Sequence, residues 1–204
     1  MLEKLFALIF PTRGDEAVAR DISEEEFLAL LDPTLIPKTN PATVALLPYT
    51  DRRVRSVLHE AKYHGTPKAF TLLGAALVEY IESNDDFDHP TFCIIPIPLG
   101  SKRLRERGYN QAEEIAKYAS KKLTLPIETK LLVRTRETIS QVSLPRFARA
   151  RNMRGAFGAT RRADPAYTYI VLDDVTTTGA TLQGALSALA SAGATNLIPI
   201  ALAH

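Results

Sequence analysis

The chain has 204 residues, of which 46% are hydrophobic, a composition that suits one globular domain with a small appendage. No apolar run reaches the roughly 18 residues that a membrane-spanning helix needs, so the sequence predicts no membrane span. Cys93 is the only cysteine, which excludes an internal disulfide and a zinc site built from cysteines. These features predict a cytoplasmic protein.

The formal net charge of +2 hides a strong asymmetry along the chain. Residues 100–162 contain 16 Lys and Arg but only 5 Asp and Glu, whereas the rest of the chain is acidic. A basic block of this size favours a polyanionic partner, either the phosphates of a small molecule or a nucleic acid. A set of solvated helix faces is the alternative interpretation.

Residues 1–45 read as a small, mainly helical N-terminal appendage. The first residues predict an amphipathic helix. Its apolar face carries Leu2, Leu5, Phe6 and Ile9. A second helix is predicted over residues 21–31, because capping side chains are followed by acidic residues in the first turn. Four prolines between residues 33 and 48 predict a linker, so the predicted domains are 1–45 and 46–204.

Beyond residue 50 the pattern alternates between helices and strands. Helices are predicted over residues 51–64, 67–83, 110–123 and 180–192, and strands over 91–98, 126–133, 168–172 and 196–202. Residues 99–110 read as a basic loop. Residues 135–157 are a long, poorly patterned basic segment, and such segments are usually functional or disordered. The alternation predicts an α/β fold with a mostly parallel β-sheet flanked by helices.

The stretch from Tyr167 to Leu182, YTYIVLDDVTTTGATL, carries the most specific chemistry. An apolar strand ends in Asp173 and Asp174, and a loop rich in threonine then opens a helix. In an open α/β sheet, ligands bind at the carboxyl ends of the strands. Unpaired N–H groups and the dipole at the start of the helix suit a phosphate, and Gly179 lets the backbone approach that anion closely.

Two carboxylates beside a phosphate cradle would repel the phosphate unless they bind something else. Vicinal sugar hydroxyls donate hydrogen bonds to carboxylates, so the motif predicts a site for a ribose 5-phosphate group. A capped turn without a ligand is the alternative. The motif is neither a Walker A loop, because no Gly-Lys-Ser/Thr follows, nor a G-x-G-x-x-G fingerprint.

The sequence VLDDVTTTGAT resembles the signature of type I phosphoribosyltransferases, which bind 5-phosphoribosyl-1-pyrophosphate (PRPP). More narrowly, the chain resembles the ComF family of competence-related, phosphoribosyltransferase-like proteins. The other stretches that carry this resemblance are KYHG at 62–65, IPIPLGSKRLRERGYNQ at 95–111, and the R-x-T-x-x-Q…GAF pattern at 136–157. Many members begin with a four-cysteine zinc-binding segment, which residues 1–45 lack, so we expect no zinc.

The resemblance implies a type I phosphoribosyltransferase fold and a role for each matching stretch. Asp173 and Asp174 would bind the ribose hydroxyls and would be the catalytic residues. The 5-phosphate would be bound by Thr176, Thr177, Thr178, Gly179, Ala180 and Thr181. The pyrophosphate would face Lys102, Arg103, Arg105 and Arg107. A mobile hood over the site would include Arg136, Gln141, Arg146, Arg149 and Asn152. Mg²⁺ would be held mainly through PRPP, and the four histidines, His59, His64, His89 and His204, are assigned no role.

Three functions follow from these patterns. The favoured one is a Mg²⁺-dependent phosphoribosyltransferase linked to DNA uptake, with an acceptor that the sequence does not name. The second is a non-catalytic protein that senses PRPP or handles single-stranded DNA, for which the basic block is the support. The third is an interaction protein that docks on a DNA-translocation helicase, an idea that only the resemblance suggests.

Overall fold

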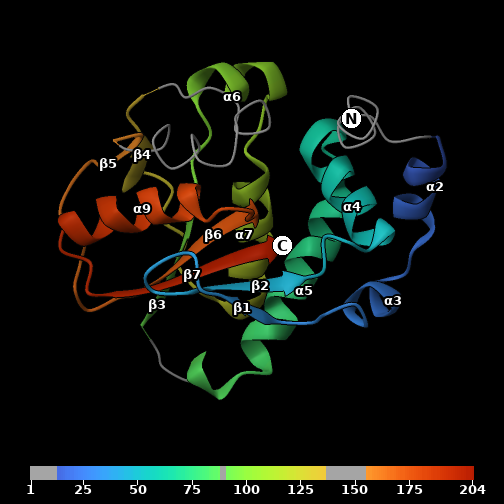
Figure 1. The fold of residues 1–204 in the computed structure, drawn as a ribbon, viewed down its shortest axis with the longest axis horizontal. Coiled ribbons are helices and arrows are strands. Elements are labelled where there is room, and N and C mark those ends of the chain that lie inside the picture. Colours follow the sequence, from blue (N-terminus) through green and yellow to red (C-terminus); the bar gives the residue numbers. More distant parts are fainter. Residues whose placement is uncertain (1–12, 88–90, 137–154) are drawn as a thin grey trace.

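A five-stranded sheet forms the centre of the computed structural model, which describes residues 13–87, 91–136 and 155–204 (Figure 1). Its strands lie in the order β1-β2-β7-β6-β3, with bounds Thr34–Ile36 for β1, Thr43–Leu47 for β2, Phe92–Pro96 for β3, Thr168–Val175 for β6 and Asn196–Ala203 for β7. Strands β2, β7, β6 and β3 run parallel, whereas β1 pairs antiparallel with β2 at one edge. The predicted α/β fold with a mostly parallel sheet is therefore confirmed.

Successive side chains of β6 enter two hydrophobic cores on opposite faces of the sheet, as the period of two in a strand requires. Ile170 and Leu172 belong to the core that also contains residues of α5 (Pro67–Glu82) and α7 (Gln111–Leu123). Tyr169 and Val171 belong to the core beneath α9 (Ala180–Ser191). A separate hairpin of β4 (Leu132–Arg134) and β5 (Phe157–Ala159) packs on this second face beside α9.

The remaining helices cover the first core and the rim of the sheet. They are α2 (Arg13–Asp21), α3 (Glu24–Leu28), α4 (Arg52–His59), the π-helix η1 (Glu60–His64), the 3-10 turn η2 (Asp85–Phe87) and α6 (Ser101–Arg107). The predicted capping box is present at α3, where Ser23 accepts from the N–H of Glu26 and the Glu26 carboxylate accepts from the N–H of Ser23. Among the described residues, no helix combines the length and the apolarity that crossing a membrane requires.

The predicted linker over residues 33–48 is wrong, because this stretch contains β1 and β2. Its prolines stand beside or between the strands, where Pro33 precedes β1 and Pro48 follows β2. The run Thr43–Leu47 is apolar and almost fully buried between β1 and β7. Strand β2 runs across residue 45, so the predicted domain boundary does not coincide with a break between elements. The division of the chain into two domains stays a prediction. The predicted amphipathic helix of the first residues lies outside the described part of the chain.

Two further expectations need correction. The stretch predicted as a basic loop over residues 99–110 contains the short helix α6, which ends at Gly108 in a left-handed conformation with φ 84°. The strand predicted over residues 126–133 is much shorter. Ile127 makes one isolated bridge to Ile94, and regular pairing begins only at Leu132, in the separate hairpin.

Candidate functional site

The carboxyl ends of β3 and β6 lie side by side at the point where the chain connections change from one face of the sheet to the other. These two strands are parallel neighbours. The connection from β3 leads through α6 to α7 on the first face, and the connection from β6 leads directly to α9 on the second face. Loops that diverge in this way leave a ligand-binding crevice at the carboxyl ends of the strands. Asp173 and Asp174 lie at this end of β6.

The two aspartates occupy different environments. The side chain of Asp174 is buried, and its Oδ2 atom lies 2.9 Å from Lys62 Nζ and 2.6 Å from Gln111 Nε2. Its Oδ1 atom accepts a hydrogen bond of 2.6 Å from the N–H of Val175. Asp173 is half-buried, and its Oδ1 atom accepts 2.9 Å from the N–H of Asp174. Asp174 is therefore locked in place, while Asp173 keeps one carboxylate oxygen without a described hydrogen bond.

These environments shift the pKa values of the two aspartates in opposite directions. Burial, reinforced by the negative charge of Asp174, raises the pKa of Asp173 to about 7. Burial would also raise the pKa of Asp174, but the charge of Lys62 and the hydrogen bonds from Lys62 and Gln111 hold it below its usual value. Burial opposes the charge on Lys62 as well, yet the neighbouring Asp174 raises the pKa of this ammonium. Near neutral pH the site thus holds one firmly charged carboxylate beside one that is ready to exchange a proton.

We expect Asp173→Asn to raise the melting temperature more at pH 8 than at pH 5. Because the pKa of Asp173 rises from 3.8 to about 7 on folding, the ionised side chain opposes folding. The unfavourable contribution of ionised Asp173 to folding stability begins above pH 3.8, grows with rising pH and reaches its full size above about pH 7. Thermal unfolding of both proteins at several pH values measures the difference. An increase that is independent of pH would contradict this assignment.

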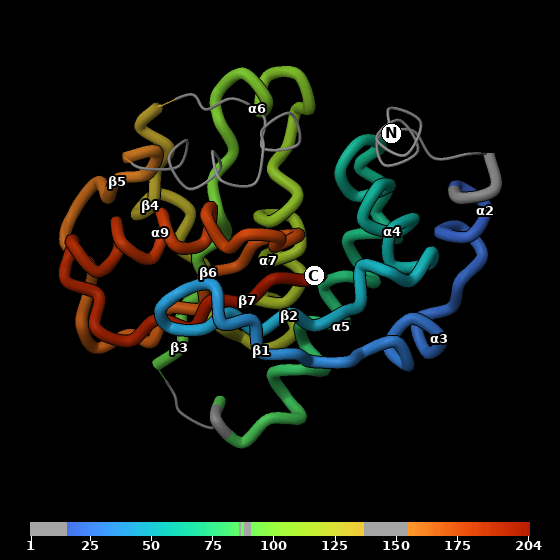
Figure 2. The backbone as a smooth tube through the Cα atoms, viewed as in Figure 1, coloured from blue at the N-terminus to red at the C-terminus, as the bar shows by residue number. Residues whose placement is uncertain are grey.

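The connection between β1 and β2 lies close to the loop that follows β6 (Figure 2) and contacts it. Lys38 Nζ donates to the carbonyl of Thr177 at 2.9 Å, and Asn40 N–H donates to Gln183 Oε1 in α9 at 2.8 Å. His204 Nδ1 lies 2.9 Å from the carbonyl of Thr176, which can only accept, so Nδ1 carries the proton. The other ring nitrogen then accepts from Lys38 at 3.3 Å. The loop is therefore held through its carbonyls.

Gly179 is the residue that turns this loop into α9. Its φ of 72° is left-handed, and a Cβ atom built there would lie 2.8 Å from Thr39 Cγ2 and 3.1 Å from the Lys38 carbonyl oxygen. Among the other predicted phosphate-binding residues, Thr176 and Ala180 are buried, Thr178 and Thr181 are half-buried, and Thr177 is exposed. The structure thus brings the predicted 5-phosphate loop to the start of α9, directly beyond the two aspartates.

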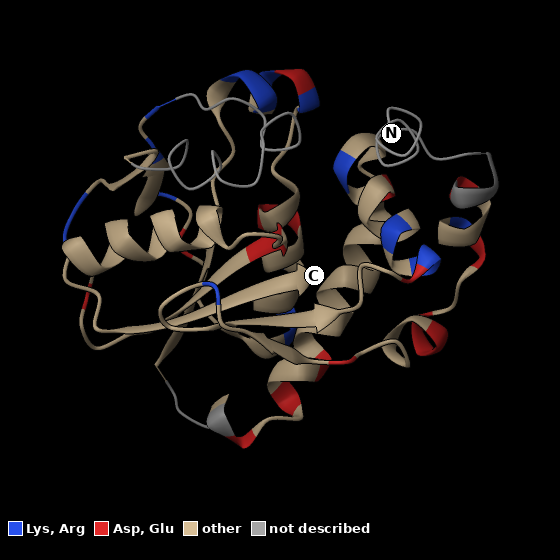
Figure 3. Ribbon diagram, in the orientation of Figure 1, with Lys and Arg blue, Asp and Glu red and all other residues tan. Residues whose placement is uncertain are grey.

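The predicted pyrophosphate residues all lie on α6, at one rim of the molecule (Figure 3). Arg107 is the one that connects to the aspartates, because its guanidinium donates to Gln111 Oε1 and Gln111 donates in turn to Asp174. Arg107 also lies 5.5 Å above the ring of Tyr63. Lys102 and Arg105 are exposed, Arg103 is half-buried, and Lys102 lies 3.9 Å from Glu106 one turn away.

The predicted hood falls mainly outside the described residues. Gln141, Arg146, Arg149 and Asn152 all lie there. Arg136 is described and exposed, two residues after the end of β4. The hood therefore stays a prediction.

Three site residues were missed in the sequence. Lys62 and Gln111 stand inside the KYHG and RGYNQ motifs, so the motifs marked them, but nothing in the sequence indicated that both contact Asp174. Lys38 carried no signal, because it lies in the stretch that was misread as a linker. A contact between Lys62 and Asp174 joins residues from two elements far apart in the chain, and only the fold reveals it.

Comparison with known proteins finds related sequences for under half of the chain. No family model matches it. Over 92 residues the chain is 35% identical to Competence protein F of Haemophilus influenzae, covering 44% of this chain and 40% of that protein. Over 89 residues it is 33% identical to DNA utilization protein YhgH of Escherichia coli O157:H7 and 31% identical to the YhgH protein of Salmonella typhimurium, covering 44% of this chain and 39% of each. The matched region thus spans about two-fifths of each relative, and it supports the likeness to competence-related proteins.

Proposed function

We propose that this chain is a PRPP-binding protein with a type I phosphoribosyltransferase fold, which transfers the phosphoribosyl group to an acceptor in a process linked to DNA uptake. The observation that carries the proposal is the pair Asp173–Asp174 at the end of β6, followed directly by the Gly179 turn into α9. It supplies acceptors for two sugar hydroxyls and donors for one phosphate in the order that ribose 5-phosphate requires. The names of the relatives supply the link to competence.

In this proposal each group of residues has a defined task. Asp174, kept ionised by Lys62, accepts a hydrogen bond from one ribose hydroxyl, and Asp173 accepts from its neighbour. The N–H groups at the start of α9 hold the 5-phosphate. Arg107 and its neighbours on α6 face the pyrophosphate. An acceptor then attacks the anomeric carbon, the bond from that carbon to the pyrophosphate oxygen breaks, and the transition state resembles an oxocarbenium ion.

The described carboxylates fit a Mg²⁺ ion that is bound chiefly through the ligand. Three groups already donate to Asp174, and Asp173 leaves only one oxygen for a metal, directly or through water. Mg²⁺ commonly keeps several waters and binds through one or two carboxylates together with substrate phosphates. When bound, the ion would neutralise the charge of the leaving pyrophosphate.

Calorimetric titration of the full chain with PRPP in the presence of Mg²⁺ tests the proposal. We expect saturable one-to-one binding, weaker binding of ribose 5-phosphate, and loss of the PRPP signal when Mg²⁺ is chelated. Lys117→Met is a control variant that should leave PRPP binding unchanged, because the ion pairs of this surface lysine with described residues are those to Glu113 and Glu114 on α7. Absence of PRPP binding with and without Mg²⁺ would overturn the proposal. If PRPP binds, release of pyrophosphate that depends on an added acceptor would establish transfer.

Handling of single-stranded DNA, in contact with a DNA-translocation helicase, is the second candidate. The names of the relatives mention competence and DNA utilization, which supports a role connected with DNA. Proteins of this kind combine basic grooves with aromatic side chains that stack on bases. Phe157 is buried here, and the Tyr109 and Tyr118 rings pack against Gly65 and Gly74. These aromatic rings serve packing, which favours PRPP binding as the primary function.

A further inference from the structure

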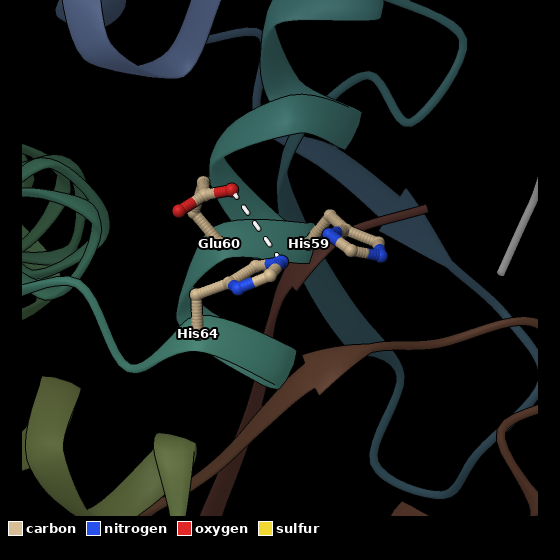
Figure 4. Close-up of side chains that lie close together, drawn as sticks. All are labelled: His59, Glu60 and His64. Carbon is tan, nitrogen blue, oxygen red and sulfur yellow. Dashed lines mark ion pairs between the residues drawn. The ribbon is translucent and has the colours of Figure 1, made fainter. Parts of the chain in front are cut away.

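A cluster of two imidazoles and a carboxylate lies where α4 continues into the π-helix η1 (Figure 4). Its members are His59, Glu60 and His64, and one ligand atom from each lies within 4.8 Å of the other two. The Nε2 atom of His64 is 3.9 Å from Glu60 Oε1, and the rings of His59 and His64 have centroids 5.6 Å apart. We infer that these three side chains form a binding site for a divalent transition metal ion of the Zn²⁺ type.

The π-helical turn is what brings the two histidines together. In an α-helix, residues five positions apart point in directions that differ by about 140°. Here the N–H of Gly65 donates to the carbonyl of Glu60, five residues earlier, at 2.8 Å. This wider turn places His64 near His59 while keeping it beside Glu60. Single π-turns inside helices occur frequently at functional sites, and a metal site would account for the π-turn here.

Neighbouring groups orient the proposed ligands. Thr66 Oγ1 donates to Glu60 Oε2 at 3.1 Å, which leaves Oε1 directed at His64. The ring of Tyr63 lies 4.6 Å from the ring of His59. Hydrogen bonds and contacts of this outer kind commonly fix the ligands of protein-bound metals. The Glu60 side chain is 12% exposed and that of His64 is 47% exposed, so the cluster is anchored on one side and open to an entering ion on the other.

The donor set selects the class of ion. Two imidazole nitrogens and one carboxylate oxygen suit Zn²⁺, Co²⁺ or Ni²⁺, whereas Mg²⁺ and Ca²⁺ prefer oxygen ligands. Ligand atoms at about 2.0–2.1 Å from a tetrahedral ion lie about 3.3 Å apart, so His64 Nε2 and Glu60 Oε1, which are 3.9 Å apart here, must approach each other when an ion binds. Three protein ligands leave one position for water or another small ligand. This site uses none of the residues that are proposed to bind PRPP, although Lys62 lies on the same turn.

Titration of the metal-free full chain with Zn²⁺ tests the inference. Dialysis against a chelator precedes calorimetry, and Co²⁺ serves as the visible-light probe of tetrahedral coordination. We expect one equivalent to bind, with a rise in melting temperature. His64→Gln and Glu60→Gln should each weaken Zn²⁺ binding at least about 100-fold, and Thr66→Val, which removes only the outer hydrogen bond, about 10-fold.

His204→Gln is the matched control, because it removes a histidine that belongs to a different part of the structure. Its Zn²⁺ affinity should equal that of the unmodified chain. Circular dichroism of each variant without metal shows whether it is folded. If His64→Gln and Glu60→Gln fold and bind Zn²⁺ as tightly as the control, or if the unmodified chain binds no stoichiometric Zn²⁺, the inference is wrong and the cluster is an ordinary His–Glu ion pair.

Discussion

Replacing Asp174 by asparagine is expected to weaken PRPP binding at least about 10-fold and also to destabilise the fold. The carboxylate is the firmly charged acceptor of the proposed site, and a hydrogen bond to a charged group contributes about 1.5–3 kcal/mol. Its loss should therefore weaken binding about 10- to 150-fold, and disturbance of the Gln111–Arg107 connection should weaken it further.

The stability effect of Asp174→Asn comes from Lys62. This ammonium loses its charged partner, but its side chain is 28% exposed and reaches some water. We therefore expect a loss of about 1–3 kcal/mol, below the 3–5 kcal/mol that breaking a fully buried ion pair costs. Urea denaturation measures the loss of stability, and calorimetry with PRPP and Mg²⁺ measures binding.

Lys62→Met and the double variant complete a thermodynamic cycle for the pair. If Lys62 and Asp174 interact as the structure shows, the double variant should be less destabilised than the sum of the two single changes. Asp173→Asn is the neighbouring control, which should not destabilise the fold at pH 8. Wild-type PRPP affinity in Asp174→Asn would remove this residue from the site, and strict additivity would show that the ion pair contributes nothing.

Gly179→Ala is expected to cost about 2–5 kcal/mol of stability and to weaken PRPP binding. Two effects add here. A left-handed conformation costs a residue with a side chain about 1–2 kcal/mol, and overpacking commonly adds about 1–3 kcal/mol. The new methyl group would meet Thr39 Cγ2 at 2.8 Å and the backbone oxygen of Lys38 at 3.1 Å. The β1–β2 connection must then retreat, which moves the loop that is proposed to hold the phosphate.

Gly108→Ala separates the two effects by urea denaturation. Gly108 has φ 84° and ψ −12°, close to the 72° and −1° of Gly179, but a Cβ atom there would meet none of the described atoms within 4 Å. This control should show the backbone cost alone, about 1–2 kcal/mol. Equal losses in the two variants would mean that the β1–β2 connection yields freely and does not support the loop.

The sequence predicted the part of the site that is built from neighbouring residues. The apolar run, the two aspartates, the glycine and the following helix are consecutive, so their strand–loop–helix arrangement follows from local preferences. The helices over residues 51–64, 67–83 and 110–123 were found for the same reason, since apolar spacing, Pro67 and the Asn110 cap mark them. Their packing on the first face could not be read from spacing alone.

The errors arise where a distant contact overrides the local signal. Prolines around residues 33–48 predicted a break, yet pairing with β7 makes a strand of Thr43–Leu47. The charges of Asp173 and Asp174 looked equivalent in the sequence, and Lys62 and Gln111 make them different. The histidines gave no sign of a cluster, because the spacing of five between His59 and His64 brings side chains together only in a π-helical turn.

The strand order has a consequence for how the chain folds. Strand β7 lies between β2 and β6. The parallel pairing of β2, for example between Val44 and Ile200, therefore forms only after β7 is present. During synthesis, β7 is the last strand of the sheet to be made, and until then β2 and β6 have no strand to join them. Contacts between residues so far apart in sequence slow folding, because a long loop must close first. The sheet is therefore completed late. The contacts between the β1–β2 connection and the loop that follows β6 form only in that final step.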